Sequence, residues 1–156
     1  MAANTANRET VRDAFAALLS TALTGTGNPV QVVYNYPIGK IEQSPTVCVA
    51  SSGTARLRAG IGDSRWNSYF VLEVFTFIRD ADAANGWTEA EVEDQLDLID
   101  KEIADCVADY RVNANWHNIS FVIDNQSIPE QSEIVTDTER GYKLEMRKVY
   151  IQKMDS

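Results

Sequence analysis

The sequence has few of the side chains on which most catalytic and metal sites depend. It holds one histidine, His117, and two cysteines, Cys48 and Cys106, which lie far apart. A zinc site needs several such ligands, and a Ser-His-Asp triad could only be built around His117. No G-x-S-x-G or Walker sequence is present, and "GTGNPV" lacks the third glycine of a dinucleotide-binding loop. We therefore expect no catalytic residues, no metal and no cofactor.

Long apolar runs and a surplus of positive charge are missing as well. No apolar run approaches the ~18 residues that span a bilayer, and "MAANTANRETVRD" contains no apolar signal core. A formal net charge of −9 disfavours broad binding to nucleic-acid phosphates. These features predict a cytosolic product that binds no membrane, in which both cysteines are reduced, buried thiols rather than a disulfide.

The overall composition of the chain is that of one globular domain. Of the 156 residues, 44% are hydrophobic and 24% are charged, which is ordinary for folded proteins and enough for a core. No linker, internal repeat or low-complexity tract divides the chain. We predict a single domain over residues 1–156, with residues 1–6 as a flexible N-terminal tail.

Hydrophobic periodicity predicts two main helices and several strands. The helices are expected at about 7–23 and 88–110, and the strands at 30–36, 46–51, 68–78, 117–124, 132–137 and 141–154. The stretch Gly53–Ser68 is rich in Gly, Ser and Arg, which indicates a long loop or a ragged hairpin. Short connections between neighbouring strands favour an α+β fold, with a mostly antiparallel or mixed sheet flanked by the two helices.

Two of these strands allow a finer prediction. The strand "SYFVLEVFTFI" is apolar on both faces, which predicts a central strand covered on both sides. In the last strand the apolar residues change face between Met146 and Val149, which predicts a β-bulge at Arg147–Lys148. The solvent-facing side of that strand is then expected to hold Lys143, Glu145 and Arg147.

The second helix, within "WTEAEVEDQLDLIDKEIADCVADY", is strongly acidic. Thr88 and Glu91 match a capping box, and Trp87 is placed to pack on Val92. Helical spacing groups the apolar side chains on one stripe, expected in the core: Val92, Leu96, Ile99, Ile103, Cys106, Val107 and Tyr110. The carboxylates diverge around the remaining circumference, which indicates a solvated face rather than a metal site. The alternative is a partner-facing surface, with Asp94, Leu98 and Glu102 as contact residues.

Three arginines, Arg56, Arg58 and Arg65, lie close together in this otherwise acidic chain. They are either solvated loop charges or contacts to an acidic neighbour, such as the acidic helix of the next identical subunit. A basic loop that meets an acidic helix is a head-to-tail contact, and such contacts can close into rings.

One pattern resembles an enzyme. Pro129-Glu130 followed by Glu145-Met146-Arg147 is similar to the strand acids of Mg²⁺-dependent nucleases. A lysine is usual after the second acid, whereas this sequence has Arg147 there, with Lys148 next to it. The alternative is an ordinary amphipathic strand, and we keep the nuclease as the enzyme hypothesis.

The order of elements resembles a known family. An opening amphipathic helix, "VQVVYNY", "TVCVASS", a Gly/Arg stretch, "SYFVLEVFTFI", "WTEAEVEDQLDLI" and "GYKLEMRKVYIQ" together are similar to the tail terminator (tail completion) proteins of long-tailed bacteriophages. The resemblance covers about residues 8–153 and concerns the order and character of elements rather than an invariant motif. It supplies no catalytic residues to transfer.

The resemblance implies a structural virion protein. Such subunits are made in the host cytoplasm and form a homo-hexameric ring at the head-proximal end of the tail. The ring caps the tail tube, stops its polymerisation and binds the neck or head-completion protein, while DNA passes through the lumen without specific binding. The contact residues we expect on this basis are Arg56, Arg58, Arg65, Asp94, Leu98, Glu102 and Arg147. Another head–tail neck or connector protein is the nearest alternative.

Overall fold

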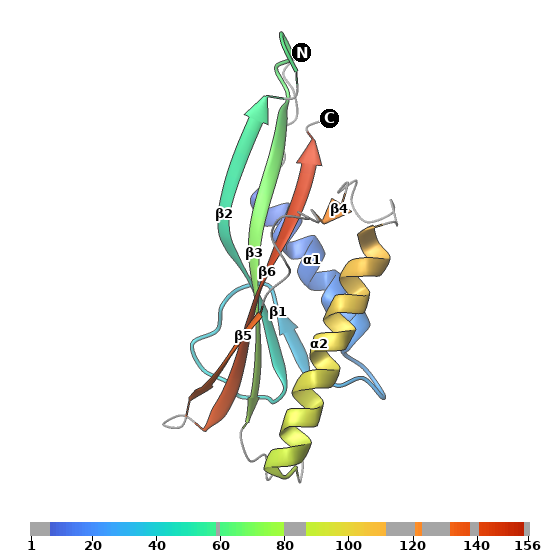
Figure 1. Cartoon of the computed structure of the whole chain (residues 1–156), viewed down its shortest axis with the longest axis vertical. Coiled ribbons are helices and arrows are strands. Elements are labelled where there is room, and N and C mark those ends of the chain that lie inside the picture. Colours follow the sequence, from blue (N-terminus) through green and yellow to red (C-terminus); the bar gives the residue numbers. More distant parts are fainter. Residues whose placement is uncertain are drawn as a thin grey trace.

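The computed structural model describes residues 7–58, 60–79, 87–111, 121–122, 132–137 and 141–154. Its elements in chain order are α1 (Arg8–Leu23), β1 (Val32–Tyr34), β2 (Thr46–Arg58), β3 (Trp66–Arg79), α2 (Glu89–Arg111), β4 (Phe121–Val122), β5 (Ser132–Asp137) and β6 (Tyr142–Met154). Both helices lie on the same face of one mixed sheet (Figure 1). The predicted α+β class is therefore confirmed.

The sheet has the strand order β1-β2-β3-β6-β4, and β5 also pairs with β6. Of the strand pairs that the structure describes, β1 and β2 run parallel and the others antiparallel. The far edge of β6 is shared, because β5 pairs with residues 142–147 and β4 with residues 151–152. The prediction that β3 is central is confirmed, since β2 and β6 flank it along most of its length.

Helix α1 begins and ends where local signals place it. The Asn7 side chain accepts a hydrogen bond from the Glu9 N–H at 2.8 Å, which caps one of the unpaired donors of the first turn. After Leu23 the chain turns through Gly25, whose φ of +101° favours glycine. The buried stripe of the helix packs on the sheet and comprises Val11, Phe15, Ala16, Leu18, Leu19 and Leu23.

Helix α2 has the predicted capping box. Thr88 N–H donates to the Glu91 carboxylate at 2.7 Å, and Glu91 N–H donates to Thr88 Oγ1 at 3.3 Å. Trp87 packs against the buried cluster formed by Ile78, Val92 and Leu96. The predicted core stripe from Val92 to Val107 is buried, whereas the side chain of Tyr110 lies outside the described residues.

The two faces of β3 are covered differently. Toward the helices, its side chains from Ser68 to Ile78 are buried, as at Phe70 and Leu72. On the opposite face, called the open face below, Val71, Phe75 and Phe77 are only half-buried. The open face is covered in part, because the backbone of Ile38 hydrogen-bonds to the buried Cys48 thiol. The prediction that β3 is covered on both sides was therefore wrong for much of its length, since both helices pack on the same face.

Strands β2 and β3 form a long hairpin. The stretch Gly53–Ser68 had indicated a loop or a ragged hairpin, and the hairpin is what forms: β2 continues to Arg58 and β3 starts at Trp66. A β-bulge at Ser52 shifts the register, because Ser51 pairs with Leu72 and Gly53 with Val71. The distal half of the hairpin extends beyond both helices (Figure 1). We call residues 53–58 and 60–68 the hairpin arm.

Strand β6 contains no bulge at Arg147–Lys148, so that prediction was wrong. Its register with β3 runs without a break from Tyr142 to Met154. The apparent change of face arises because Glu145 and Arg147, expected in solvent, point toward the helices, where each is 5% exposed. Polar partners on other elements, described below, make this burial possible.

Both cysteines are buried and reduced, as predicted. Burial raises the pKa of the Cys48 thiol, and a hydrogen bond to the Ile38 backbone opposes that shift. Within the ranges that the structure describes, no helix is long and apolar enough to cross a membrane. His117, Pro129-Glu130 and the predicted tail 1–6 lie outside the described residues, as does the predicted strand 117–124 except for β4.

Candidate assembly surfaces

The hairpin arm presents large apolar side chains to solvent. Leu57 is 60% exposed, Trp66 is 40% exposed, and Ile61 in the turn is fully exposed. The arm is thus apolar at its tip in a region where neither helix can cover it (Figure 1). Arms of this kind are typical of protein contacts, because exposed Trp and Leu side chains gain stability when a partner covers them.

Two of the predicted arginines lie together on the arm. Beyond the bulge, even-numbered residues of β2 point to the helix side of the sheet and odd-numbered residues to the open face. The Arg56 guanidinium accordingly lies 5.9 Å from the centroid of the Phe70 ring, which is buried on the helix side. Arg58 is two residues further on and therefore shares this side. Arg56 and Arg58 thus lie on one side of β2, and their contact with a neighbour stays a prediction.

Arg65 is separated from the other two and is paired within its own turn. Its side chain donates to both carboxylate oxygens of Asp63, at 2.7 to 3.1 Å, and its backbone N–H donates to the same group at 2.9 Å. These hydrogen bonds lower the pKa of Asp63 from 3.8 to about 2. The charge of Arg65 is thus balanced by Asp63, a partner two residues away that the sequence prediction did not consider.

Helix α2 has an exposed acidic surface, as predicted. Asp94 is exposed, Leu98 is 40% exposed and Glu102 is partly exposed. The side of α2 next to β6 and β5 is also acidic, and we call it the acidic flank: Glu93, Asp97 and Asp100. Its first and last members pair with strand cations, Glu93 with Lys143 and Asp100 with Arg147. Asp97 lies between them at helical spacing and is exposed.

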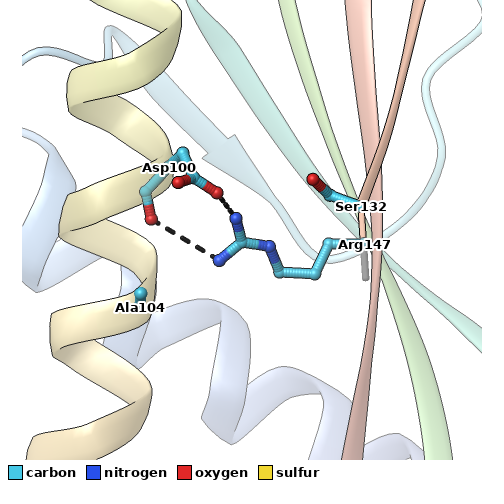
Figure 2. Close-up of a pocket in the computed structure, with 4 residues that line it drawn as sticks. All are labelled: Asp100, Ala104, Ser132 and Arg147. Atoms are coloured by element: carbon cyan, nitrogen blue, oxygen red, sulfur yellow. Dashed lines mark hydrogen bonds and ion pairs between the residues drawn. The ribbon is translucent and has the colours of Figure 1, made fainter. Parts of the chain in front are cut away.

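A small pocket of about 320 Å³ lies between α2, β5 and β6. Figure 2 shows Arg147 reaching from β6 to Asp100 on the helix, with Ala104 and Ser132 on the remaining walls. The guanidinium contacts the Asp100 carboxylate and donates to the Asp100 carbonyl at 3.5 Å. Burial lowers the pKa of Arg147, because its charged form loses water on entering this site. Arg147 was predicted as a contact residue, whereas the structure buries it beneath α2.

Two residues of the nuclease hypothesis, Glu145 and Lys148, point to opposite faces of the sheet. Glu145 points to the helix side, where it accepts a hydrogen bond from Ser132 Oγ at 2.6 Å. Lys148 is exposed and points to the open face, because it lies opposite Glu73 in β3. Strand geometry therefore places this acid and this lysine on opposite faces of the sheet. Among the described residues, no group of three or more His, Cys, Asp or Glu side chains is placed to hold a metal ion.

The open face has an aromatic and aliphatic strip that the sequence prediction missed. Phe77 contacts Phe75 and Tyr142, with ring centroids 6.4 and 5.5 Å apart. Register adds Leu144 and Met146 of β6 beside these rings, all half-buried. The sequence does contain a signal for this strip. Apolar residues alternate in the first half of β6, and they pair with the apolar residues that β3 presents on the open face.

A scan against models of known protein families gave no match. A search of curated protein sequences gave no significant match either. Three surfaces of the described residues are candidates for contacts: the hairpin arm, the acidic surface of α2 and the open face of the sheet.

Proposed function

We propose that this chain is a structural subunit of a long-tailed bacteriophage, of the tail-terminator type. In this proposal six copies form a ring at the head-proximal end of the tail. The ring caps the tail tube, stops its polymerisation and binds the neck protein, while DNA passes through its centre. The observation on which the proposal depends is the hairpin arm, which projects beyond the helices with Leu57, Ile61 and Trp66 exposed.

The composition of the arm supports a role in assembly. Trp and Arg are enriched among the residues that contribute most to protein contacts, and the arm combines Trp66 with Arg56 and Arg58. A projecting arm reaches a neighbour without any rearrangement of the core, because β2 and β3 already pair along its length. Folding therefore orders the arm before a partner arrives, which lowers the entropy cost of binding.

The distribution of charge supports contacts between copies. The arm has Arg56 and Arg58, whereas the exposed surface of α2 has Glu91, Asp94 and Asp97. Two complementary surfaces on one subunit favour head-to-tail contacts, which close into a ring when the rotation between copies allows. The formal net charge of −9 suits a lumen through which DNA slides, because like charges oppose adhesion.

Native mass spectrometry over a wide concentration series, with negative-stain imaging of each oligomer, tests this proposal. We expect six-fold rings with an open centre. In a second experiment the protein is added to a tail-tube protein that is polymerising. We expect tube elongation to stop, with a ring at the end of each tube. Rings that bind head-side components but leave elongation unchanged would favour a neck protein. A chain that forms no ring and does not stop elongation would contradict the proposal.

A further inference from the structure

Among the strands that the structure describes, the sheet leaves two stretches of edge unpaired, one on each side. Strand β1 pairs only with Thr46–Cys48 of β2, so no described strand pairs with the outer edge of the arm residues 53–58. On the opposite side, β5 pairs with β6, and no other described strand pairs with it. Five of the six side chains of β5 are exposed, including Ile134 at 51% and Val135 at 39%. Open edges with exposed β-branched residues are templates for a further strand.

The two edges are complementary in length and direction. Each has six residues, 53–58 in β2 and 132–137 in β5. Within the sheet β2 runs antiparallel to β3, β3 to β6, and β6 to β5, so β2 and β5 run in opposite directions. A second copy placed beside the first in the same orientation therefore presents its β5 antiparallel to β2.

The side chains of the two edges also match face by face. On β2, Leu57 points to the open face, while Arg56 and Arg58 point to the helix side. On β5, Val135 lies opposite Leu144 and so points to the open face. The helix side of β5 adjoins α2, since Ser132 and Asp100 line the same pocket (Figure 2).

We propose that residues 53–58 of one copy pair as an antiparallel strand with residues 132–137 of a second copy, joining their sheets edge to edge. The pairing would place Arg56 and Arg58 toward the acidic flank of the second copy. When all six residues pair, Leu57 lies opposite Glu133 and diagonally from Val135. The strand pairing alone produces both sets of contacts, because the side chains of paired strands share the same two faces of the sheet. The inference rests on the proposed function in one respect, that copies of this chain assemble.

The offset between the two edges determines how the copies are arranged. Ala55 pairs with Tyr69 of β3, whereas Ile134 lies opposite Glu145, which pairs with Thr76. The edges are thus seven residues apart along β3, or about 23 Å at the usual rise of a strand. Each copy is therefore shifted along the strand direction relative to the one before. Strands in such an assembly are tilted, and a closed sheet requires such a stagger.

Disulfide trapping between two single variants tests the pairing. Leu57→Cys and Glu133→Cys are prepared separately, mixed at the concentration at which the wild type assembles, and oxidised. We expect a cross-linked dimer in the mixture and none with either variant alone, because the two ends of the contact differ. Val135→Cys, on the same face two residues away, replaces Glu133→Cys to cover the adjacent register. The buried Cys48 and Cys106 are retained, since the single variants report any background they cause.

Leu98→Cys is the matched control for Val135→Cys. Leu98 is 40% exposed, close to the 39% of Val135, but it lies on α2, away from the open face. Dimers of Leu57→Cys alone, or equal trapping with Leu98→Cys, would overturn the pairing. Oligomers of normal size without any trapped dimer would overturn it as well and leave the assembly proposal standing. Absence of self-association at every concentration would also overturn it, and tube capping would then decide the proposed function separately.

Discussion

The two faces of β3 are almost equally apolar in sequence but have different surroundings. On the helix side Phe70, Leu72 and Ile78 are completely buried, whereas on the open face Val71, Phe75 and Phe77 remain half-exposed. The cause is that α1 and α2 both pack on one side of the sheet (Figure 1). An apolar strand face therefore predicts that the face is covered. The cover can come from the same chain or from a partner molecule.

This contrast separates the molecule into a covered part and an open part. The covered part comprises the helices and the sheet face beneath them, and we expect it to supply most of the folding stability. The open part comprises the open face, the outer edges and the hairpin arm, and we expect it to supply the contacts between molecules. Variants in the two parts should therefore affect different measurements.

The largest effect is expected from reversing charge on the arm. Arg56→Glu with Arg58→Glu should abolish ring formation while the monomer stays folded, because both side chains lie at an edge outside the core. Loss of the Arg56 contact with Phe70 should cost at most about 1 kcal/mol of folding stability. Native mass spectrometry and circular dichroism measure the two properties.

Lys40→Glu is the control for this charge reversal, since Lys40 is exposed in the segment between β1 and β2. It should leave both assembly and folding unchanged. Normal rings from the double variant would disprove a role of the arm arginines in assembly and remove the proposed distinction between the two parts.

The second effect compares one phenylalanine from each face of β3. Phe70→Ala should lower the free energy of unfolding by about 3–5 kcal/mol, because the side chain is fully buried and leaves a cavity. Phe75→Ala should cost only about 1–2 kcal/mol, since its side chain is half-exposed already. Urea denaturation of the monomer gives both values. Equal losses would show that the open face is as much a part of the core as the helix side.

The third effect compares two ion pairs between α2 and β6. Asp100→Asn removes the charge that faces the buried Arg147 and should cost about 1–3 kcal/mol. Glu93→Gln should cost less than about 1 kcal/mol, because Glu93 is half-exposed and its partner Lys143 is the more exposed of the two cations. Urea denaturation again gives both values, and a larger loss for Glu93→Gln would contradict the role assigned to Arg147.

The smallest effect concerns the turn of the arm. The pKa of Asp63 is about 2 when folded and 3.8 ordinarily, so its interaction with Arg65 favours folding fully above pH 3.8. That contribution is lost as the pH falls through about 2. Arg65→Ala should return the pKa of Asp63 toward 3.8 and leave assembly unchanged. NMR titration of the carboxyl carbon measures this, and an unchanged pKa would show that Arg65 is not the cause.

Local signals sufficed for most of the covered part. The capping box at Thr88 and the apolar stripe from Val92 to Val107 depend on residues close in sequence, and the structure places them as expected. The length of β2 was underestimated, because the Gly and Arg residues after Ser51 resemble a loop until pairing with β3 is known.

The errors concern features that depend on distant partners. Glu145 and Arg147 were assigned to solvent because isolated charges favour water, whereas Ser132 and Asp100 satisfy them inside the fold. The role of Asp63 was missed because the arginines were considered without their neighbours. Arm and helix contact residues stay predictions, since contacts between molecules depend on a second molecule.

The bulge at Ser52 has a consequence for how the arm can change. One extra residue inverts the alternation of β2, so that Arg56 and Arg58 share the side of the helices and Leu57 the opposite side. Deleting Ser52 would remove the bulge and leave Gly53 opposite Val71, so the sides would stay as they are, whereas a regular pairing of Ser52 with Val71 would exchange them. The bulge thus determines which side chains of the arm face a given partner, and a shift of the pairing by one residue at Ser52 would exchange the two sets of contacts.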